Sequence, residues 1–533
     1  MVPEELSDDG WIVLERNIDR DKLRFQETIF TLGNSYVGSR GVLEEGYRQG
    51  YPGTYITGVY DSGGQLPEIV NAPNPVVVEI YVDGRKLSLD EMGVIEHRRI
   101  LDMKRAVLYR RTLFVDGEKR YEYRSSRFLS LREQHLGVMS FSLEALDCDV
   151  SVTVKCVVDG TTRNEIQAVG DPVRHYTVMQ AHGMGSDPLY LEARTDASSV
   201  VIGMASLTEA HNTGGSYECQ IKSHGDENCV SREFSFQARK GKRYSFTRYF
   251  SIYTSRDTQR NIHTSCLAEV MRARECGAAQ LLRRHTQCWR RRWRYSDVAI
   301  DGDPAIQQAV RFNLYHLLIA APLEDMDVSL PAKALSGEWY KGHVFWDTEI
   351  YMFPFFMYTQ PKIARNLLLY RYRRLEQARR NASMQGGKGA LFPWESADTG
   401  EEVTPRLWRG PDGKIIKVHT KPMQHHIVGD ISWAVSMYYM VTGDIRFMLD
   451  YGAEVIFESA RFWASRVNYD EDTALYHIPE VTGPDEYHKG VDDSFYTNYL
   501  ARWNLLYAAS LYQEFLGSHP RYIKKLEDKM NLP

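Results

Sequence analysis

Residues 76–84 read VVVEIYVDG, a run rich in β-branched residues that ends in an Asp-Gly pair. β-Branched residues favour strands, and Asp-Gly supports the positive φ angles of a tight hairpin turn. The stretch therefore predicts a strand that enters a hairpin. Similar stretches follow at 106–114, 119–129, 138–144 and 150–158, and strands continue to about Tyr253. Many short strands separated by Gly and Asp turns predict an antiparallel β-sandwich domain over residues 1–260.

The periodicity changes near Asn261. Residues 268–293 carry a helical pattern that is rich in arginine. Such a surface is conceivable for nucleic-acid binding, but its aromatic residues are few and the whole chain is acidic. We therefore interpret residues 261–300 as a solvated helical linker.

Residues 301–533 predict a helical domain. Asp303 and Pro304 form an N-cap and first-turn pair ahead of an apolar helical face. Further helices are expected at 347–359, 361–380, 427–441, 445–467, 494–517 and 520–529, which makes seven with the first. The loops between them are long and rich in Gly and Pro, and long loops in a compact domain are usually functional.

The composition narrows the class of protein. The chain has 533 residues, 65 Lys and Arg and 70 Asp and Glu, so its formal net charge is −5. This length predicts roughly two or three domains, and the acidity argues against a dedicated nucleic-acid binder. No apolar run approaches a membrane span, and residues 1–16 lack the apolar core of a signal peptide. We expect a cytoplasmic protein with no membrane partner.

Neither a metal nor a cofactor is expected. The seven cysteines form no CxxC pair, and their odd number favours reduced thiols. His425 and His426 are adjacent, so on a helix they do not face one ligand position. The glycine-rich segment Gly33–Gly41 matches neither a Rossmann fingerprint nor a P-loop, and we interpret it as a turn in the sandwich.

Three loop clusters in the helical half place carboxylic acids next to aromatic residues. Aromatic rings beside carboxylates suit sugar binding, because a ring stacks on the apolar face of a pyranose while acids bind its hydroxyls. A single loop acid more often has a solvated or capping role, but three such clusters in one domain favour a binding site. The clusters are Gly342–Glu349 (GHVFWDTE), Pro393–Glu402 (PWESADTGEE) and Thr482–His488 (TGPDEYH).

Cleavage of a glycosidic bond needs an acid that can protonate the leaving oxygen, and partial burial beside apolar rings helps an acid to keep its proton. Glu486, between Pro484 and Tyr487, is the best candidate for this acid, and Asp485 is its close rival.

The three clusters resemble glycoside hydrolase family 65, which contains inverting α-glucoside phosphorylases. The resemblance also includes Phe30–Gly41 (FTLGNSYVGSRG), Leu43–Gly46 (LEEG) and Ala501–Asn504 (ARWN), and these motifs occur in the family's order along essentially the whole chain. It implies an N-terminal β-sandwich, a helical linker, an (α/α)6 barrel and a small C-terminal β-domain.

The resemblance also implies roles for individual residues. Glu486 would be the general acid, Trp346 and Asp347 would hold the glucosyl unit, and Trp394 and Glu395 would line the same pocket near the acceptor. Inorganic phosphate would then be the co-substrate and would attack the anomeric carbon from the opposite face to give β-glucose 1-phosphate. A phosphate anion needs no general base, so one protein carboxyl suffices.

The sequence departs from the family's pattern at three places. Trp339 and Ser35 stand where members usually have Gly, and Trp339 would narrow the pocket mouth. Seven helices do not complete a twelve-helix barrel, and the family's phosphate-binding residues lie beyond Pro533. We therefore expect a C-terminally truncated sequence with an incomplete barrel.

Two alternatives stay open. One is a hydrolase that resembles acid trehalase, which would need a second carboxylate as base; Asp398, Glu401 and Glu402 are available. The other is a non-catalytic or inactive fragment that binds carbohydrate. The resemblance also implies a homodimer for the complete protein, and it assigns acceptor choice to the loop 404–424 without identifying the disaccharide.

Overall fold

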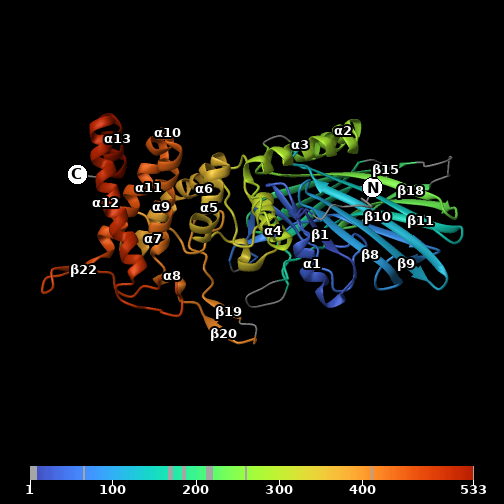
Figure 1. Cartoon of the computed structure of the whole chain (residues 1–533), viewed down its shortest axis with the longest axis horizontal. Helices are drawn as coiled ribbons and strands as arrows, with labels where there is room; N and C mark the ends of the chain where they lie inside the picture. The colour runs from blue at the N-terminus through green and yellow to red at the C-terminus, as the bar shows by residue number, and fades with distance from the viewer. Residues whose placement is uncertain are drawn as a thin grey trace.

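The computed structural model describes residues 9–63, 66–165, 172–182, 188–211, 220–258, 261–409 and 412–531. Residues 1–8, part of the stretch examined for a signal peptide, and Cys219 lie outside these ranges. A β-rich part and a helical part lie side by side along the long axis of the molecule (Figure 1).

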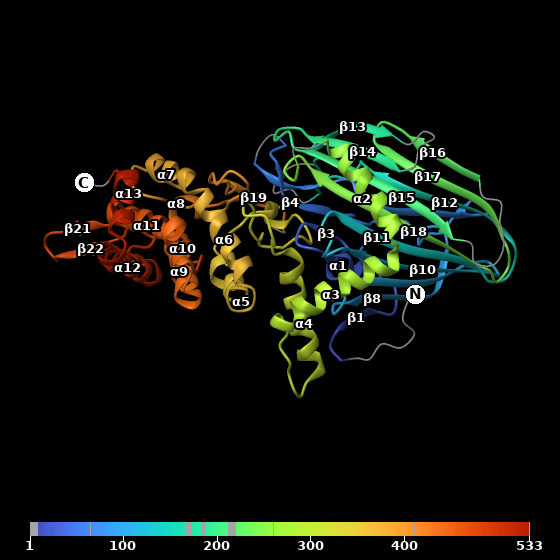
Figure 2. The ribbon, with the colours of Figure 1, turned by 90° about the horizontal axis from the view of Figure 1, so that it is seen from above.

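Two antiparallel sheets pack face to face in the β-rich part (Figure 2), which confirms the expected sandwich. Aromatic and aliphatic side chains fill the space between them, among them Phe141, Val152, Phe234 and Phe246. The larger sheet has nine strands, in the order β1 (Ile12–Glu15), β8 (Gly93–Asp102), β9 (Val107–Asp116), β10 (Lys119–Leu129), β11 (Leu136–Ala145), β18 (Arg243–Thr254), β15 (Val201–His211), β14 (Leu189–Thr195) and β13 (Tyr176–His182). The smaller sheet has five, in the order β16 (Gln220–Gly225), β17 (Cys229–Ala238), β12 (Val150–Asp159), β6 (Asn74–Val82) and β7 (Arg85–Lys86).

The hairpin expected at residues 83–84 joins β6 to β7. Asp83 and Gly84 have φ angles of 48° and 83°, the left-handed pair that a tight two-residue turn requires.

A third sheet of four strands carries the glycine-rich segment. Its strands are β2 (Leu32–Gly33), β3 (Val37–Ser39), β4 (Thr54–Asp61) and β5 (Glu68–Asn71), and it follows the short helix α1 (Leu23–Ile29). The expectation of a turn in the sandwich is wrong, because the segment forms a hairpin of β2 and β3 in this separate sheet. It packs on the helical part: a Cβ on Gly33 would lie 2.9 Å from the Ile319 oxygen, and one on Gly38 would overlap the Leu335 oxygen. Glycine is thus needed for close backbone approach.

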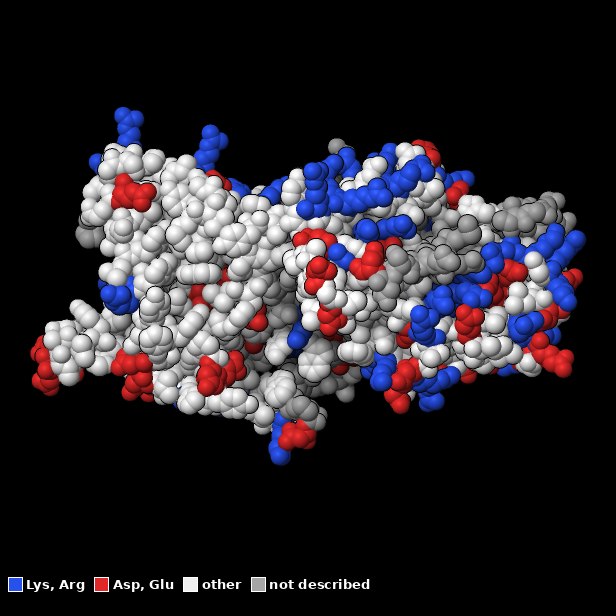
Figure 3. Space-filling model, in the orientation of Figure 1, with Lys and Arg blue, Asp and Glu red and all other residues white. Residues whose placement is uncertain are grey.

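The linker consists of two helices, not one. Gly277, at φ 78°, separates α2 (Ile262–Cys276) from α3 (Ala278–Ser296), so the expectation of one helix over 268–293 is wrong. Both lie along the nine-stranded sheet (Figure 2), and α2 packs Cys266 and Val270 on it. Lys and Arg side chains gather over these helices (Figure 3).

The second half is helical, as predicted. The Asp303 side chain accepts a hydrogen bond from Ala305 N and so caps the first helix. Arg374 interrupts the expected helix 361–380. None of the described helices has the length and apolar character to cross a membrane. The main helices are α4 (Pro304–Ala320), α5 (Phe353–Thr359), α6 (Pro361–Arg373), α7 (Leu375–Met384), α9 (His426–Thr442), α11 (Ala453–Arg466), α12 (Phe495–Ser518) and α13 (Pro520–Met530).

Candidate active site

The first two acid-aromatic clusters lie side by side. Val344 N donates to Ser396 O at 2.9 Å, and Ser396 N donates to Val344 O at 3.0 Å, so one antiparallel bridge joins two loops about 50 residues apart in sequence. The bridge brings the rings of Trp346 and Trp394 to 6.3 Å between centroids, with their planes 32° apart. The structure therefore assembles these two predicted clusters into one site.

A histidine that the sequence did not single out as a site residue completes this aromatic cluster. The ring of His426, at the start of α9, lies 4.7 Å from that of Trp346 and 5.3 Å from that of Trp394. His426 Nδ1 lies 2.7 Å from Asp430 Oδ2, and Tyr496 donates to Asp430 Oδ1 at 2.8 Å. The i, i+4 spacing of His426 and Asp430 on a helix was the available signal.

The two acids that the resemblance assigns to sugar binding differ in their surroundings. Asp347 is half-buried, and burial raises the pKa of its carboxyl. Glu395 is buried, and His343 Nδ1 lies 2.7 Å from its Oε2. Burial raises the pKa of Glu395 although His343 opposes the shift.

A buried ion pair supports the loop that carries Trp346 and Asp347. Arg371 Nε and Nη2 donate to the two oxygens of Glu349 at 2.8 and 2.9 Å, and Nη2 also donates to Phe345 O at 3.0 Å. Both side chains are 1% exposed. Burial alone would lower the pKa of Arg371, but the Glu349 carboxylate outweighs it and raises that pKa.

Glu486 lies in an exposed loop, so the expectation of a carboxyl that is partly buried against aromatic rings is wrong for this structure. Its neighbour Tyr487 is 96% exposed and provides no wall. Gln424 Nε2 donates to Glu486 Oε1 at 3.4 Å, and Gln424 lies two residues before His426. Thr482 N also donates to Met423 O at 2.9 Å, so these two contacts join the third cluster to the segment that leads into His426.

Asp485, the second candidate for the general acid, contacts groups of its own loop. Tyr487 N donates to its Oδ1 at 3.0 Å, and His488 Nδ1 lies 2.7 Å from its Oδ2. These two contacts, the backbone one first, lower the pKa of Asp485. A carboxyl held in its ionised form is a poor proton donor, which argues against Asp485 as the general acid.

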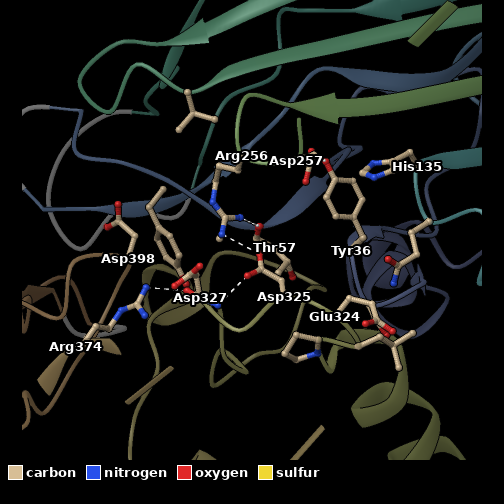
Figure 4. Close-up of a pocket in the computed structure, with 17 residues that line it drawn as sticks. Tyr36, Thr57, His135, Arg256, Asp257, Glu324, Asp325, Asp327, Arg374 and Asp398 are labelled. Carbon is tan, nitrogen blue, oxygen red and sulfur yellow. Dashed lines mark hydrogen bonds and ion pairs between the residues drawn. The ribbon is translucent and has the colours of Figure 1, made fainter. Parts of the chain in front are cut away.

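The three acids considered as a hydrolytic base differ from one another in their contacts and exposure. The Glu402 carboxylate accepts hydrogen bonds from Trp394 N at 2.7 Å and from Thr404 N at 3.0 Å, so it pins the loop. Glu401 and Asp398 are exposed. Asp398 lines a separate hollow of about 540 Å³ between the β-rich and helical parts (Figure 4).

Charged side chains that line this hollow pair with each other or with backbone oxygens nearby. Arg256 donates to Thr57 O at 2.9 Å and pairs with Asp325 at 2.9 Å, and Arg374 donates to Asp327 O at 2.7 Å. None of the five predicted site residues lines it. Among the described residues, no three His, Cys, Asp or Glu side chains are arranged to hold a metal ion.

Sequence comparisons identify the family of the chain. Residues 13–292 match the N-terminal domain of glycosyl hydrolase family 65, and residues 311–531 match its central catalytic domain. Kojibiose phosphorylase from Thermoanaerobacter brockii is 38% identical over 98% of this chain and 68% of that protein. Alpha,alpha-trehalose phosphorylase from the same organism is 32% identical over 98% of this chain and 69% of that protein.

The fold has a solved counterpart. A structure named "Putative kojibiose phosphorylase from human microbiome" superposes with a TM-score of 0.86 at 24% identity, over 99% of this chain and 68% of that one. Both halves of the chain, taken with its relatives, lead to one conclusion: the chain belongs to glycosyl hydrolase family 65.

Proposed function

We propose that this protein cleaves an α-glucosyl disaccharide with inorganic phosphate and inverts the anomeric configuration. The observation that carries the proposal is the Val344–Ser396 bridge, which joins the Trp346–Asp347 and Trp394–Glu395 pairs in one aromatic site. Flat rings beside carboxylates suit a pyranose. The relatives named above are disaccharide phosphorylases, which supports the same reaction class.

In the proposed reaction, Glu486 donates its proton to the glycosidic oxygen as the bond from that oxygen to the anomeric carbon breaks. A phosphate oxygen forms a new bond to this carbon from the opposite face. The products are β-glucose 1-phosphate and a free sugar. Because phosphate enters as an anion, no protein base is required. This agrees with the position of the Glu402 carboxylate, which already accepts a hydrogen bond from Trp394 N.

Trp346 and Trp394 would stack on the sugar, while Asp347 and Glu395 would bind its hydroxyls. Gln424, two residues before His426 of the aromatic cluster, donates to Glu486 Oε1, and the proposal requires a bound sugar to lie between this acid and the rings. A homodimer, which rests on the resemblance, and a cytoplasmic location, which rests on the polar sequence of residues 1–16, belong to the same proposal.

The test is a phosphate-dependence assay on kojibiose, trehalose, nigerose and maltose. Glucose 1-phosphate should form from at least one of them, and only when phosphate is present. Free glucose in the absence of phosphate would identify a hydrolase, and calorimetric binding without turnover would identify a non-catalytic protein; either result overturns the proposal.

A matched pair of variants tests the acid. Glu486→Gln should lower kcat about 100-fold or more, which is the usual scale for loss of a general acid. Asp485→Asn, one residue away, should retain most of the activity because Asp485 serves its own loop. Equal losses in both variants would show that the loop, not the proton donor, matters.

A further inference from the structure

His343 connects the β-rich part to a predicted sugar-binding acid. It lies in the first cluster and is fully buried. Its Nε2 lies 2.6 Å from the carbonyl oxygen of Pro67, just before β5, and its Nδ1 lies 2.7 Å from Glu395 Oε2. One imidazole thus bridges two chain segments that belong to different halves of the molecule.

The Pro67 carbonyl fixes the proton on one side of this ring. A carbonyl oxygen only accepts hydrogen bonds, so Nε2 must carry a hydrogen. The contact of 2.7 Å between Nδ1 and the Glu395 carboxyl then needs one more proton. Either an imidazolium donates to a carboxylate, or a carboxylic acid donates to a neutral imidazole. In both forms the pair is neutral overall, which suits its burial.

The four-stranded sheet holds the segment that leads into His343. Tyr340 and Lys341 have φ angles of 55° and 56°, a strained left-handed conformation for both. Lys341 pairs with Glu68 of β5, and Tyr60 of β4 donates to Gly342 O at 2.6 Å. Surrounding contacts of this kind are what allow a strained backbone to persist, and such strain clusters at functional sites.

The other oxygen of Glu395 is available for a ligand. No described residue donates a hydrogen bond to Glu395 Oε1, and the side chain keeps 9% of its surface exposed. His343 therefore occupies one carboxyl oxygen and leaves the second unoccupied. A carboxylate fixed in this way binds a hydroxyl without first losing rotational freedom.

We propose that His343 is a positioning residue: the Pro67 carbonyl orients it, and it in turn fixes Glu395 so that Oε1 receives a sugar hydroxyl. This inference rests on the proposed function, because it takes Glu395 as a sugar ligand. It makes the β-rich part a component of the binding site.

Two substitutions separate the two contacts of His343. His343→Gln places an amide N–H donor near the Nε2 position, so it keeps the hydrogen bond to Pro67 O and loses the contact with Glu395. His343→Asn places a donor near the Nδ1 position, so it keeps Glu395 and loses Pro67. A hydrogen bond to a charged group contributes enough that His343→Gln should raise KM roughly 10- to 100-fold with a smaller change in kcat. His343→Asn should recover part of this loss.

Tyr60→Phe is the matched control, since it removes the Tyr60 bond to Gly342 O and leaves both contacts of His343 in place. It should change KM less than about threefold. Equal losses in Tyr60→Phe and His343→Gln would reduce the role of His343 to general support of the loop and would overturn the inference.

A spectroscopic readout separates this inference from the proposed function. In 15N-histidine NMR spectra, His343, assigned by its absence in His343→Gln, should show a protonated Nε2 and a strongly hydrogen-bonded Nδ1. Glu395→Gln should shift the Nδ1 signal and leave Nε2 protonated. A bare Nε2 would overturn the inference even in an active enzyme. If the wild type shows these signals and cleaves no disaccharide, the proposed function fails, and with it the sugar-binding role assigned to Glu395.

Discussion

Raising the pH from about 6 to about 9.5 should cost the β-rich part about 3 kcal/mol of stability through one side chain, His175. Its Nδ1 lies 3.5 Å from Asp61 Oδ2, and its Nε2 lies 3.4 Å from Glu68 Oε2. All three side chains are at most 5% exposed. Burial alone would lower the pKa of His175, but the two carboxylates outweigh it and raise the pKa to about 9.

The size of this loss in stability follows from the difference between the folded and unfolded pKa values of His175. An unfolded histidine has a pKa of about 6.5, and each pKa unit corresponds to about 1.36 kcal/mol, so a rise to about 9 is worth about 3 kcal/mol. Because the pKa is raised on folding, this stabilisation is fully present only below pH 6.5. It is lost as the pH rises toward 9, where the folded protein also gives up the proton.

The assay is urea unfolding of the wild type and His175→Gln at about pH 6, pH 7.5 and pH 9.5. The difference in the free energy of unfolding should be largest at pH 6 and should shrink toward pH 9.5, because glutamine does not titrate. Thr162→Val is the control: it removes a buried hydroxyl that lies 2.6 Å from the Tyr176 hydroxyl and should give the same loss at each pH. A His175→Gln difference that is constant or grows with pH would show that Asp61 and Glu68 do not raise the pKa of His175 in the folded protein.

Three further predictions concern stability. Glu349→Gln leaves the buried Arg371 guanidinium without its carboxylate and should cost about 3–5 kcal/mol in urea unfolding; a cost below about 1 kcal/mol would contradict the burial of this pair. Gly38→Ala forces a Cβ onto the Leu335 carbonyl, and calorimetry should show a loss of about 2 kcal/mol or more. Gly517→Ala, in α12 with no neighbouring atom within 4 Å, should instead raise stability by about 0.5–1 kcal/mol in the same measurement, and a loss there would contradict the open surroundings.

Local signals made the β-rich half predictable. The alternation and the Asp-Gly pair at residues 83–84 act within a few residues, and the strands lie close to their expected positions. The predicted helix boundaries were less accurate, because such local signals do not always mark where a helix ends. Gly277 adopts a positive φ angle that ends α2, and a single glycine in a helical pattern does not by itself announce such a break.

The site was predictable only in part. The composition of each cluster pointed to carbohydrate chemistry, and the structure brings together the rings of Trp346 and Trp394 on two bridged loops that also carry Asp347 and Glu395. The contribution of the four-stranded sheet could not be predicted, because the contact between His343 and Pro67 joins residues 276 positions apart and leaves no local pattern. The exposure of Glu486 was missed because aromatic neighbours in sequence do not fix where a loop lies.

Proton NMR of the reaction with kojibiose and inorganic phosphate, recorded from the first minutes, decides whether the enzyme is an inverting phosphorylase. If the proposed mechanism operates, the β anomer of glucose 1-phosphate appears first, in step with the loss of kojibiose and only when phosphate is added. Direct formation of the α anomer, or of free glucose with no sugar phosphate, would contradict it.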